Sequence, residues 1–339
     1  MKKETEIAVS VVMPVYNGEI FLKQTIGSLL NQSFSNFEII CVDDGSTDQS
    51  LALLKTFSEQ DNRVKVFTKE NGGTAAKAII YGLNFATGNY FMYSSQDDLF
   101  SNDLLEKNYA AAIKFQADAV VPDMIFYNDS KAEEKGIIGI NGDRSQTLKG
   151  RDAFVLSIDW VIHGFVFWKM ELVRKVGFYD YGINSDEFTT RMLYFNSNKV
   201  VFTDAKFYYC QNNPNAITKK WNINLLESFD TCHRLEDFLE RQNFAKDAFA
   251  RLYRTALAEL LRIQRIFLSN KKSINKEASE YTETELRKFY HSYANKIASI
   301  EFKSLTEKIK TKFIMQSYIM LKLYCKVALV YNALKSTQK

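Results

Sequence analysis

The sequence predicts an α/β protein whose first part is a mainly parallel sheet covered by helices and whose last part is all helical. In the first hundred residues, short β-branched runs alternate with amphipathic stretches about a dozen residues long. From Trp221 onward, apolar residues recur at helical intervals and no proline interrupts them. A hydrophobic content of 46% with only 14 Gly and 3 Pro indicates a folded globular protein with a sizeable core.

The predicted elements of the first part follow one another in a regular order. The strands are expected at residues 9–15, 37–42, 64–68 and 90–93, and the helices at residues 19–30, 47–58 and 75–86. Strands that alternate with helices of this length form parallel sheets with helices on both faces.

Two pairs of adjacent carboxylates follow predicted strands. Asp43 and Asp44 open the stretch VDDGSTDQS, and Asp97 and Asp98 follow the strand at residues 90–93. Ligands of open parallel sheets bind at the carboxyl ends of the strands, where these pairs should converge. The pattern favours a site for a nucleotide and for a divalent cation that bridges phosphates. The alternative is that each pair only begins a turn or caps a helix.

Several classes of protein are disfavoured by what the sequence lacks. It has neither the GxGxxG fingerprint of dinucleotide-binding folds nor the GxxxxGK[ST] of P-loop NTPases. The four cysteines are far apart and form no CxxC pair, which fits a reducing cytosol. Residues 271–339 hold 14 Lys and Arg against 6 Asp and Glu, but without a nucleic-acid-binding motif, so no nucleic-acid partner is expected. The first residues show no apolar signal segment.

Two long stretches resemble the family-2 glycosyltransferases. These are VSVVMPVYNGEIFLKQTIGSLLNQSFSNFEIICVDDGSTDQS and ENGGTAAKAIIYGLNFATGNYFMYSSQDD, and the resemblance extends loosely to about Thr218. It implies a glycosyltransferase A-type fold, a Rossmann-like mixed sheet that binds a nucleotide-sugar, over residues 1–218, with a helical region over residues 219–339. It also implies inverting transfer from a nucleotide-diphosphate sugar with the help of Mn²⁺ or Mg²⁺.

The resemblance also implies roles for particular residues. Tyr16 would stack on the base, Asp44 would accept a base N–H, and Pro14 and Asp43 would complete this pocket. Asp97 would bind the metal beside its acidic neighbour Asp98. The chain departs from the family at two places. Ser95 stands where an aspartate is common, so that Ser95 or Gln96 would contact the ribose of the donor. Lys77 stands where an arginine is common, and it would either face the diphosphate or be only an exposed helix lysine.

The catalytic base is expected in the stretch GINSDEFTTRML. Inversion needs a carboxylate that takes the proton of the acceptor hydroxyl as this hydroxyl attacks. Asp186 is the first candidate and Glu187 the second, and both precede Arg191 at an offset one residue shorter than is common in the family. The alternative is that these carboxylates only favour the start of a helix. His163 could contact substrate or lie in the core, and Trp160 and Trp168 stay unassigned.

The stretch KFIMQSYIMLKLYCKVALVYNALK at the end of the chain is predicted to form one basic amphipathic helix. Its lysines, with Lys308, Lys312, Lys322 and Lys326 on one face, would point to anionic headgroups while apolar residues enter a membrane interface. Packing on the protein itself or in a homodimer is the alternative. We therefore expect a cytoplasmic enzyme, peripheral on the inner face of the plasma membrane.

The function expected from sequence is transfer of a sugar, with a UDP-sugar as the leading donor, to a glycan acceptor of capsule, lipopolysaccharide or another surface glycan. A lipid-linked acceptor would suit the membrane contact. Two other hypotheses stay open. One is a catalytically silent scaffold of a glycan-assembly complex, because the first aspartate of the metal motif is Ser95. The other is a nucleotidyltransferase, which would need a glycine-rich, basic phosphate loop.

Overall fold

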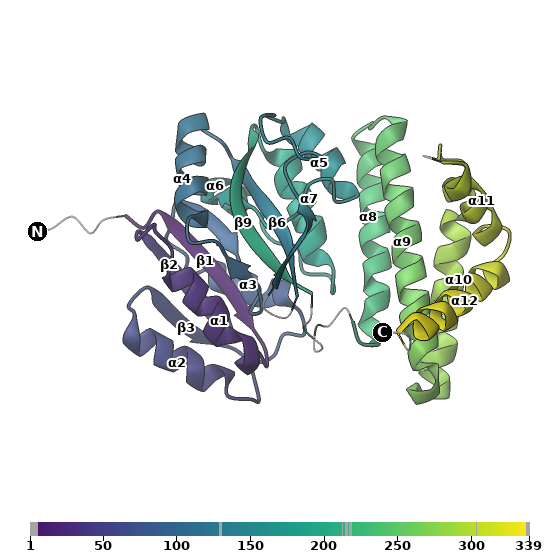
Figure 1. Ribbon diagram of the computed structural model, residues 1–339, viewed down its shortest axis with the longest axis horizontal. Coiled ribbons are helices and arrows are strands. Elements are labelled where there is room, and N and C mark those ends of the chain that lie inside the picture. Colours follow the sequence, from purple (N-terminus) through teal and green to yellow (C-terminus); the bar gives the residue numbers. More distant parts are fainter. Residues whose placement is uncertain are drawn as a thin grey trace, which may run out of the picture. The chain divides into compact units, whose positions relative to one another are not determined.

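The computed structural model describes residues 6–336, apart from 129–130, 212, 214–215, 217–218 and 303. The chain forms two compact units. The first is an α/β unit of Met1–Tyr181 and Ser185–Asn213, and the second is a helical unit of Gly182–Asn184 and Pro214–Lys339 (Figure 1).

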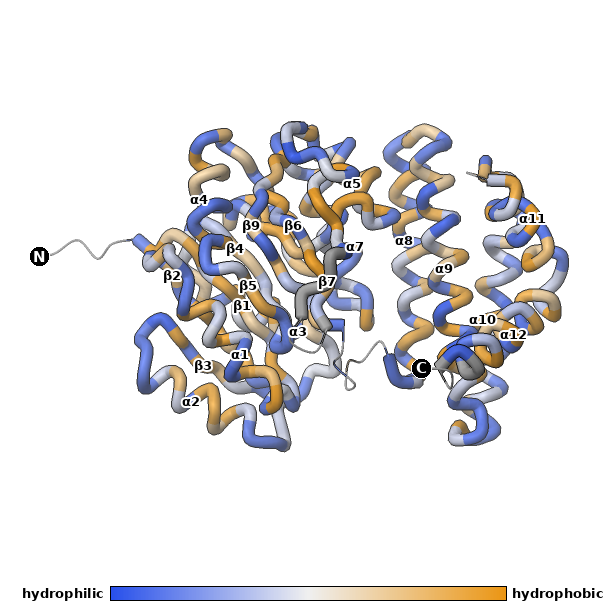
Figure 2. Tube along the Cα trace, in the orientation of Figure 1, coloured by the Kyte–Doolittle hydropathy of each residue, from blue (hydrophilic) through white to orange (hydrophobic). Residues whose placement is uncertain are grey.

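The first half of the sheet consists of four parallel strands in the order β3-β2-β1-β4. These are β1 (Val9–Val15), β2 (Phe37–Asp43), β3 (Val64–Thr68) and β4 (Tyr90–Tyr93). All seven residues of β2 and all four of β4 are buried. Their sequences are therefore mostly apolar and do not alternate between apolar and polar residues. Figure 2 shows this concentration of apolar residues along the strands.

The carboxyl ends of β1 and β4 lie side by side. Between these two strands the chain changes the direction in which it adds strands to the sheet, which makes this place the switch point. Helices α1 (Glu19–Leu30) and α2 (Ser50–Gln60) carry the chain from β1 to β2 and then β3. Helix α3 (Ala75–Leu83) returns it past both to β4, on the other side of β1. Right-handed crossovers therefore put α3 on the opposite face from α1 and α2. In such sheets the crevice at the switch point is where ligands bind.

The second half makes the sheet mixed, as the sequence predicts. It contains β5 (Leu99–Phe100), β6 (Ala119–Asn128), β7 (Lys131–Ile137), β8 (Phe167–Lys169) and β9 (Val200–Cys210). Strand β8 runs antiparallel to both β4 and β6, whereas β6 and β9 are parallel. The covering helices are α4 (Leu104–Phe115), α5 (Gly150–Ile158), α6 (Met170–Val176) and α7 (Ser185–Asn196). Their core includes Trp168 edge-on against Tyr194, both fully buried.

Helix α2 begins at Ser50, three residues later than the sequence predicts. The residues before it are used elsewhere, because Ser46, Thr47 and Asp48 bond to the loop that follows β1. Side chains of this kind compete with helix formation by offering the backbone other partners.

The helical unit is built around α9 (Lys246–Asn270). Its other elements are η1 (Ile223–Glu227), α8 (Ser228–Arg241), η2 (Lys271–Ser273), α10 (Lys276–Ala298), α11 (Leu305–Ile314) and α12 (Tyr318–Ser336). The rings of Phe229 on α8 and Phe289 on α10 stack with centroids 3.8 Å apart. Glu236 is buried and salt-bridged to Lys296 at 2.7 Å, which satisfies its charge inside the bundle.

The expectation of one continuous terminal helix is wrong. The chain breaks between α11 and α12, which meet at 118°. The break has a local cause, since Met315 ends α11 and the Ser317 hydroxyl accepts a bond from the backbone N–H of Met320 at the start of α12. Within the described residues, no single helix meets the length and hydropathy of a bilayer span, and α11 and α12 do so only when counted together.

Candidate functional site

The loops after β1 and β2 are bonded into one structure at the switch point. Asn17 has a φ of 50°, and its backbone N–H donates to the Ser46 hydroxyl at 3.0 Å. Its side-chain oxygen accepts from the Thr47 backbone N–H at 2.8 Å. The Gly18 N–H donates to the Ser50 hydroxyl at 2.8 Å. The small hydroxylated residues of VDDGSTDQS therefore shape the turn that carries Tyr16.

The carboxylates at the end of β2 are buried and only partly satisfied. Asp44 is 5% exposed, and its Oδ1 accepts from Lys69 Nζ at 2.5 Å and from the Gly72 N–H at 3.0 Å. Asp43 is 3% exposed, and its Oδ1 has no partner among the described residues. Lys69 was not singled out from the sequence, although its place just after β3 sets it at the same edge of the sheet.

Gln96 ties the loop after β4 to the loop after β1. Its Oε1 accepts from the Tyr16 N–H at 2.8 Å, and its Nε2 donates to the Tyr16 carbonyl at 3.1 Å. The Tyr16 side chain stays 48% exposed just after the carboxyl end of β1. The Gln96 amide thus holds the Tyr16 backbone, and its expected contact with the donor stays a prediction. A tethered aromatic ring with a free face suits base stacking.

The pair Asp97 and Asp98 combines one accessible carboxylate with one buried carboxylate. Asp97 is half-buried, and its Oδ2 accepts from Asn213 Nδ2 at 2.7 Å. Asp98 is 1% exposed; its Oδ1 accepts from the Cys210 N–H at 2.9 Å, and its Oδ2 has no partner among the described residues. Burial, and then the charge of Asp97, raise the pKa of Asp98 well above its ordinary value, while the bond from the Cys210 backbone N–H opposes this.

Asp97 and Asp98 alone would supply only part of the ligands of a divalent cation. The described residues contain no group of three His, Cys, Asp or Glu side chains able to enclose an ion. Mg²⁺ and Mn²⁺ prefer oxygen ligands, and Mg²⁺ is commonly held by one or two carboxylates with phosphate oxygens and water. The unsatisfied oxygen of Asp98 beside Asp97 fits such an arrangement, in which phosphate would complete the coordination.

The two candidate bases at the start of α7 differ in their partners. Glu187 Oε2 forms a salt bridge with Arg191 Nη1 at 2.5 Å, and Arg191 is 3% exposed. Asp186 is half-buried, and its pKa is raised to about 7, first by burial and then by the charge of Glu187. Glu187 therefore anchors Arg191, whereas Asp186 has the raised proton affinity of a general base near neutral pH.

Two tyrosines show that the carboxylates of α7 and of the loop after β4 share one environment. Burial raises the pKa of Tyr93 most, and the charges of Asp186, Glu187 and Asp98 raise it further. The pKa of Tyr209 is raised by burial and then by Asp98, Asp97 and Glu187. Sequence reasoning missed both tyrosines, although Tyr93 directly precedes the acidic loop. The charges of the predicted metal residues and of the predicted bases thus act on the same two tyrosines.

The remaining candidates divide between the core and the surface. His163 is 1% exposed; its Nε2 donates to the Pro122 carbonyl at 2.7 Å, and its Nδ1 accepts from the Phe165 N–H at 3.2 Å. Burial lowers its pKa to about 4, so it is a neutral core residue. Trp168 is also in the core, Trp160 is 36% exposed, and Lys77 is exposed on the first turn of α3. Pro14 lies half-buried near the end of β1.

The structure is an α/β domain with paired carboxylates at the carboxyl edge of its sheet, and its sequence contains neither of the glycine-rich phosphate-loop motifs. The chain belongs to glycosyltransferase family 2, whose model matches residues 10–177 under the description "Glycosyl transferase family 2". It is 30% identical over 240 residues to the glycosyltransferase GlyG of Streptococcus pneumoniae serotype 4, a match that covers 65% of this chain and 78% of GlyG. The protein is therefore a glycosyltransferase.

Two further likenesses bear on the chemistry. The chain is 33% identical over 133 residues to the minor teichoic acid biosynthesis protein GgaB of Bacillus subtilis, over 38% of this chain and 15% of that protein. The crystal structure of S. aureus TarS 1-349 in complex with UDP-GlcNAc matches with a TM-score of 0.61 and 15% identity, over 92% of this chain and 91% of TarS. At that identity the likeness to TarS establishes a shared fold.

Proposed function

We propose that this glycosyltransferase moves a sugar with inversion from a nucleotide-diphosphate donor, with a UDP-sugar as the leading candidate, to a hydroxyl of a surface-glycan acceptor. The choice of donor is supported by the fold shared with TarS, whose structure holds UDP-GlcNAc. The choice of acceptor is supported by the partial likeness to GgaB, which is named for teichoic acid biosynthesis.

The crevice between β1 and β4 would hold the nucleotide. Tyr16, whose backbone is tethered by Gln96, would stack on the base. Asp44 keeps one oxygen bonded to Lys69 and Gly72 and would offer the other to a base N–H. The ammonium group of Lys69 forms a salt bridge with this buried carboxylate at 2.5 Å.

Asp97 and Asp98 would hold the divalent cation. When bound, it would neutralise the diphosphate that leaves. A bound cation would also explain the burial of Asp98, because a buried carboxylate without an opposite charge is energetically unfavourable.

Asp186 would act as the base that removes the acceptor proton. One observation carries this assignment: the charges of Asp186, Glu187 and Asp98 act on the same buried hydroxyl of Tyr93. The α7 carboxylates therefore share an electrostatic environment with Asp98, as a base acting beside the donor diphosphate would need to. The salt bridge between Glu187 and Arg191 fixes the first turn of α7 and with it Asp186.

The test is release of nucleotide from a panel of UDP-, GDP-, CMP- and dTDP-sugars, with Mn²⁺ and with chelator. Release from one class of donor that depends on metal and is lost in Asp97→Ala supports the proposal. Tight binding of a donor without release under any condition, with a broad acceptor panel present, would instead favour the silent scaffold, for which Ser95 at the metal motif is the argument.

A further inference from the structure

Helices α11 and α12 each carry a stripe of exposed apolar side chains, which we call the terminal stripes. On α11 they are four residues apart, and on α12 they fall at positions three or four apart, so each set covers one face of its helix. The α11 stripe consists of Leu305, Ile309 and Phe313, and the α12 stripe of Ile319, Leu323, Val327, Val330 and Tyr331. Ile319 is 74% exposed and Leu305 is 72% exposed. Figure 2 shows apolar residues along both helices.

The opposite faces of these helices are the ones that hold the helical unit together. Ile314, Leu321 and Cys325 are fully buried. Tyr318 donates its hydroxyl to Gln264 Oε1 at 2.8 Å. The terminal stripes are therefore not needed for packing within this unit. A contiguous exposed apolar surface of this kind marks an interaction site.

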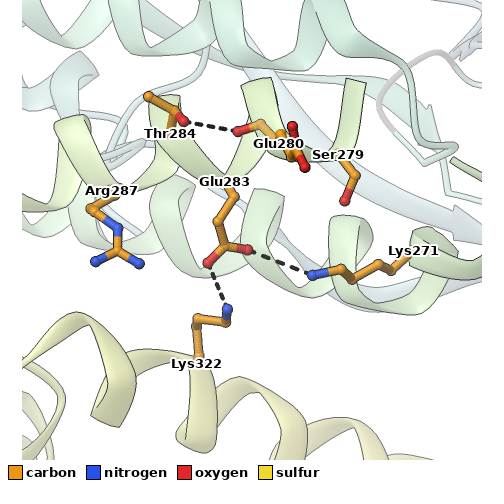
Figure 3. Close-up of a pocket in the computed structure, with 7 residues that line it drawn as sticks. All are labelled: Lys271, Ser279, Glu280, Glu283, Thr284, Arg287 and Lys322. Carbon is orange, nitrogen blue, oxygen red and sulfur yellow. Dashed lines mark hydrogen bonds and ion pairs between the residues drawn. The ribbon is translucent and has the colours of Figure 1, made fainter. Parts of the chain in front are cut away.

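The lysine expected to point toward a membrane with the others, Lys322, is instead turned inward. Its Nζ forms a salt bridge with Glu283 Oε1 at 2.6 Å, and Lys271 approaches the other oxygen of Glu283 at 3.8 Å (Figure 3). This pair orients α12 on α10. It leaves the α12 stripe exposed.

The exposed charges beside the stripes are of one sign. Residues 304–336 contain six lysines and one acidic residue, Glu307. At 3.6 residues per turn, Lys326 and Lys335 fall on either side of the α12 stripe, and Lys308 and Lys310 fall on either side of the α11 stripe. All four are exposed. An apolar stripe flanked by lysines is the pattern of a helix that lies in a membrane interface.

We propose that the terminal stripes dock the protein on an anionic lipid surface, with the apolar side chains at the acyl boundary and the flanking lysines on headgroup phosphates. A second copy of this chain fits less well. Packing a stripe on its own copy would bring the lysine rows of the two subunits together, and like charges across an interface oppose association. Lysine is also depleted in protein interfaces.

This inference goes beyond the proposed sugar transfer and does not depend on it. The cytoplasmic leaflet carries the anionic lipids of the plasma membrane, so the surface that fits best is its inner face. Docking there would bring the enzyme to an acceptor carried on a lipid.

The experiment is co-sedimentation of the full chain with vesicles of phosphatidylglycerol and phosphatidylcholine, and with vesicles of phosphatidylcholine alone. We expect binding to the anionic vesicles that weakens at 0.5 M salt, and at least tenfold weaker binding to the neutral ones. The double variant Leu323→Glu, Val327→Glu should lose at least tenfold in the partition coefficient. Both positions are exposed, so the thermal melt should not change.

The matched control is Ile113→Glu, Phe115→Glu on α4, where two apolar residues are also exposed. It adds the same charge away from the terminal stripes and should bind as the unchanged chain does. Equal loss in this control would overturn the proposal, and so would failure of the unchanged chain to bind anionic vesicles. A dimer in light scattering that the α12 variant dissociates, without vesicle binding by the parent, would assign the stripe to a second copy and would also overturn it.

Discussion

Replacing Asp186 by Asn should make the folded protein more stable above neutral pH while it slows sugar transfer by about 100-fold or more. The raised pKa of about 7 means that the native structure disfavours the ionised carboxylate relative to the unfolded chain. From the ordinary value of 3.8 the shift is about three units, at 1.36 kcal/mol each. Because Asp186 is half-buried and partly screened by solvent, we expect a gain of about 2–4 kcal/mol.

The pH dependence of this gain has a definite sign. Below about pH 4 the carboxyl is protonated in both folded and unfolded chains, and the substitution has little effect. Between pH 4 and pH 7 the unfolded chain ionises first, so the native state of the parent loses stability as pH rises. Above pH 7 both states are ionised and the difference is constant. The stability gained by Asp186→Asn should therefore grow from pH 4 to pH 7 and level off.

Denaturant unfolding of the parent and the variant at pH 5 and pH 8 measures this effect. The contrasting control is Glu187→Gln, which removes the partner of the buried Arg191 and should destabilise by about 3 kcal/mol or more. Asp186→Asn could destabilise the protein at pH 8, or have the same effect at both pH values. Either result would mean that the native structure does not disfavour the ionised carboxylate of Asp186. The assignment of a raised pKa would then be wrong.

Three further predictions concern the donor site, the metal ligand and the catalytic base. Gln96→Ala should raise the donor KM about tenfold with a smaller change in kcat, because the Tyr16 backbone loses two hydrogen bonds; an unchanged KM in steady-state kinetics would contradict the tether. Asp97→Asn should lower metal-supported turnover at least about 100-fold and raise the Mn²⁺ concentration for half-maximal rate; a metal titration of unchanged midpoint would argue against this ligand. The pH profile of kcat/KM should rise through about pH 7 as Asp186 ionises. A profile that is flat from pH 5.5 to pH 8.5 would mean that Asp186 is not the catalytic base.

The parallel half of the sheet is predictable from sequence because three of its four strands, β1, β2 and β4, are buried on both faces. Continuous apolar runs such as residues 37–42 leave little choice of structure, and the turn residues between them mark the connections. The observed β1, β3 and β4 have the predicted bounds. The edge of the sheet was likewise predictable, since the parallel order places Asp44 and Asp98 at strand ends without any knowledge of side-chain contacts.

Contacts between distant residues could not be predicted in this way. The salt bridge of Lys69 with Asp44 and the amide clamp of Gln96 on Tyr16 join residues 25 and 80 positions apart, and neither leaves a local pattern. The break before α12 was missed because apolar periodicity continues across it, while the hydroxyl of Ser317 starts a new helix. The apolar periodicity predicts which side of a helix is apolar. Which side of α12 packs on the helical unit also depends on distant contacts, such as the salt bridge of Lys322 with Glu283.

The most direct test of the account is donor turnover by Asp186→Asn at saturating donor and pH 8, with donor affinity measured by calorimetry on the same preparation. The account predicts a fall in turnover of about 100-fold or more, with a dissociation constant within about threefold of the parent value. Turnover at the parental rate would contradict the central claim that Asp186 is the base of the transfer.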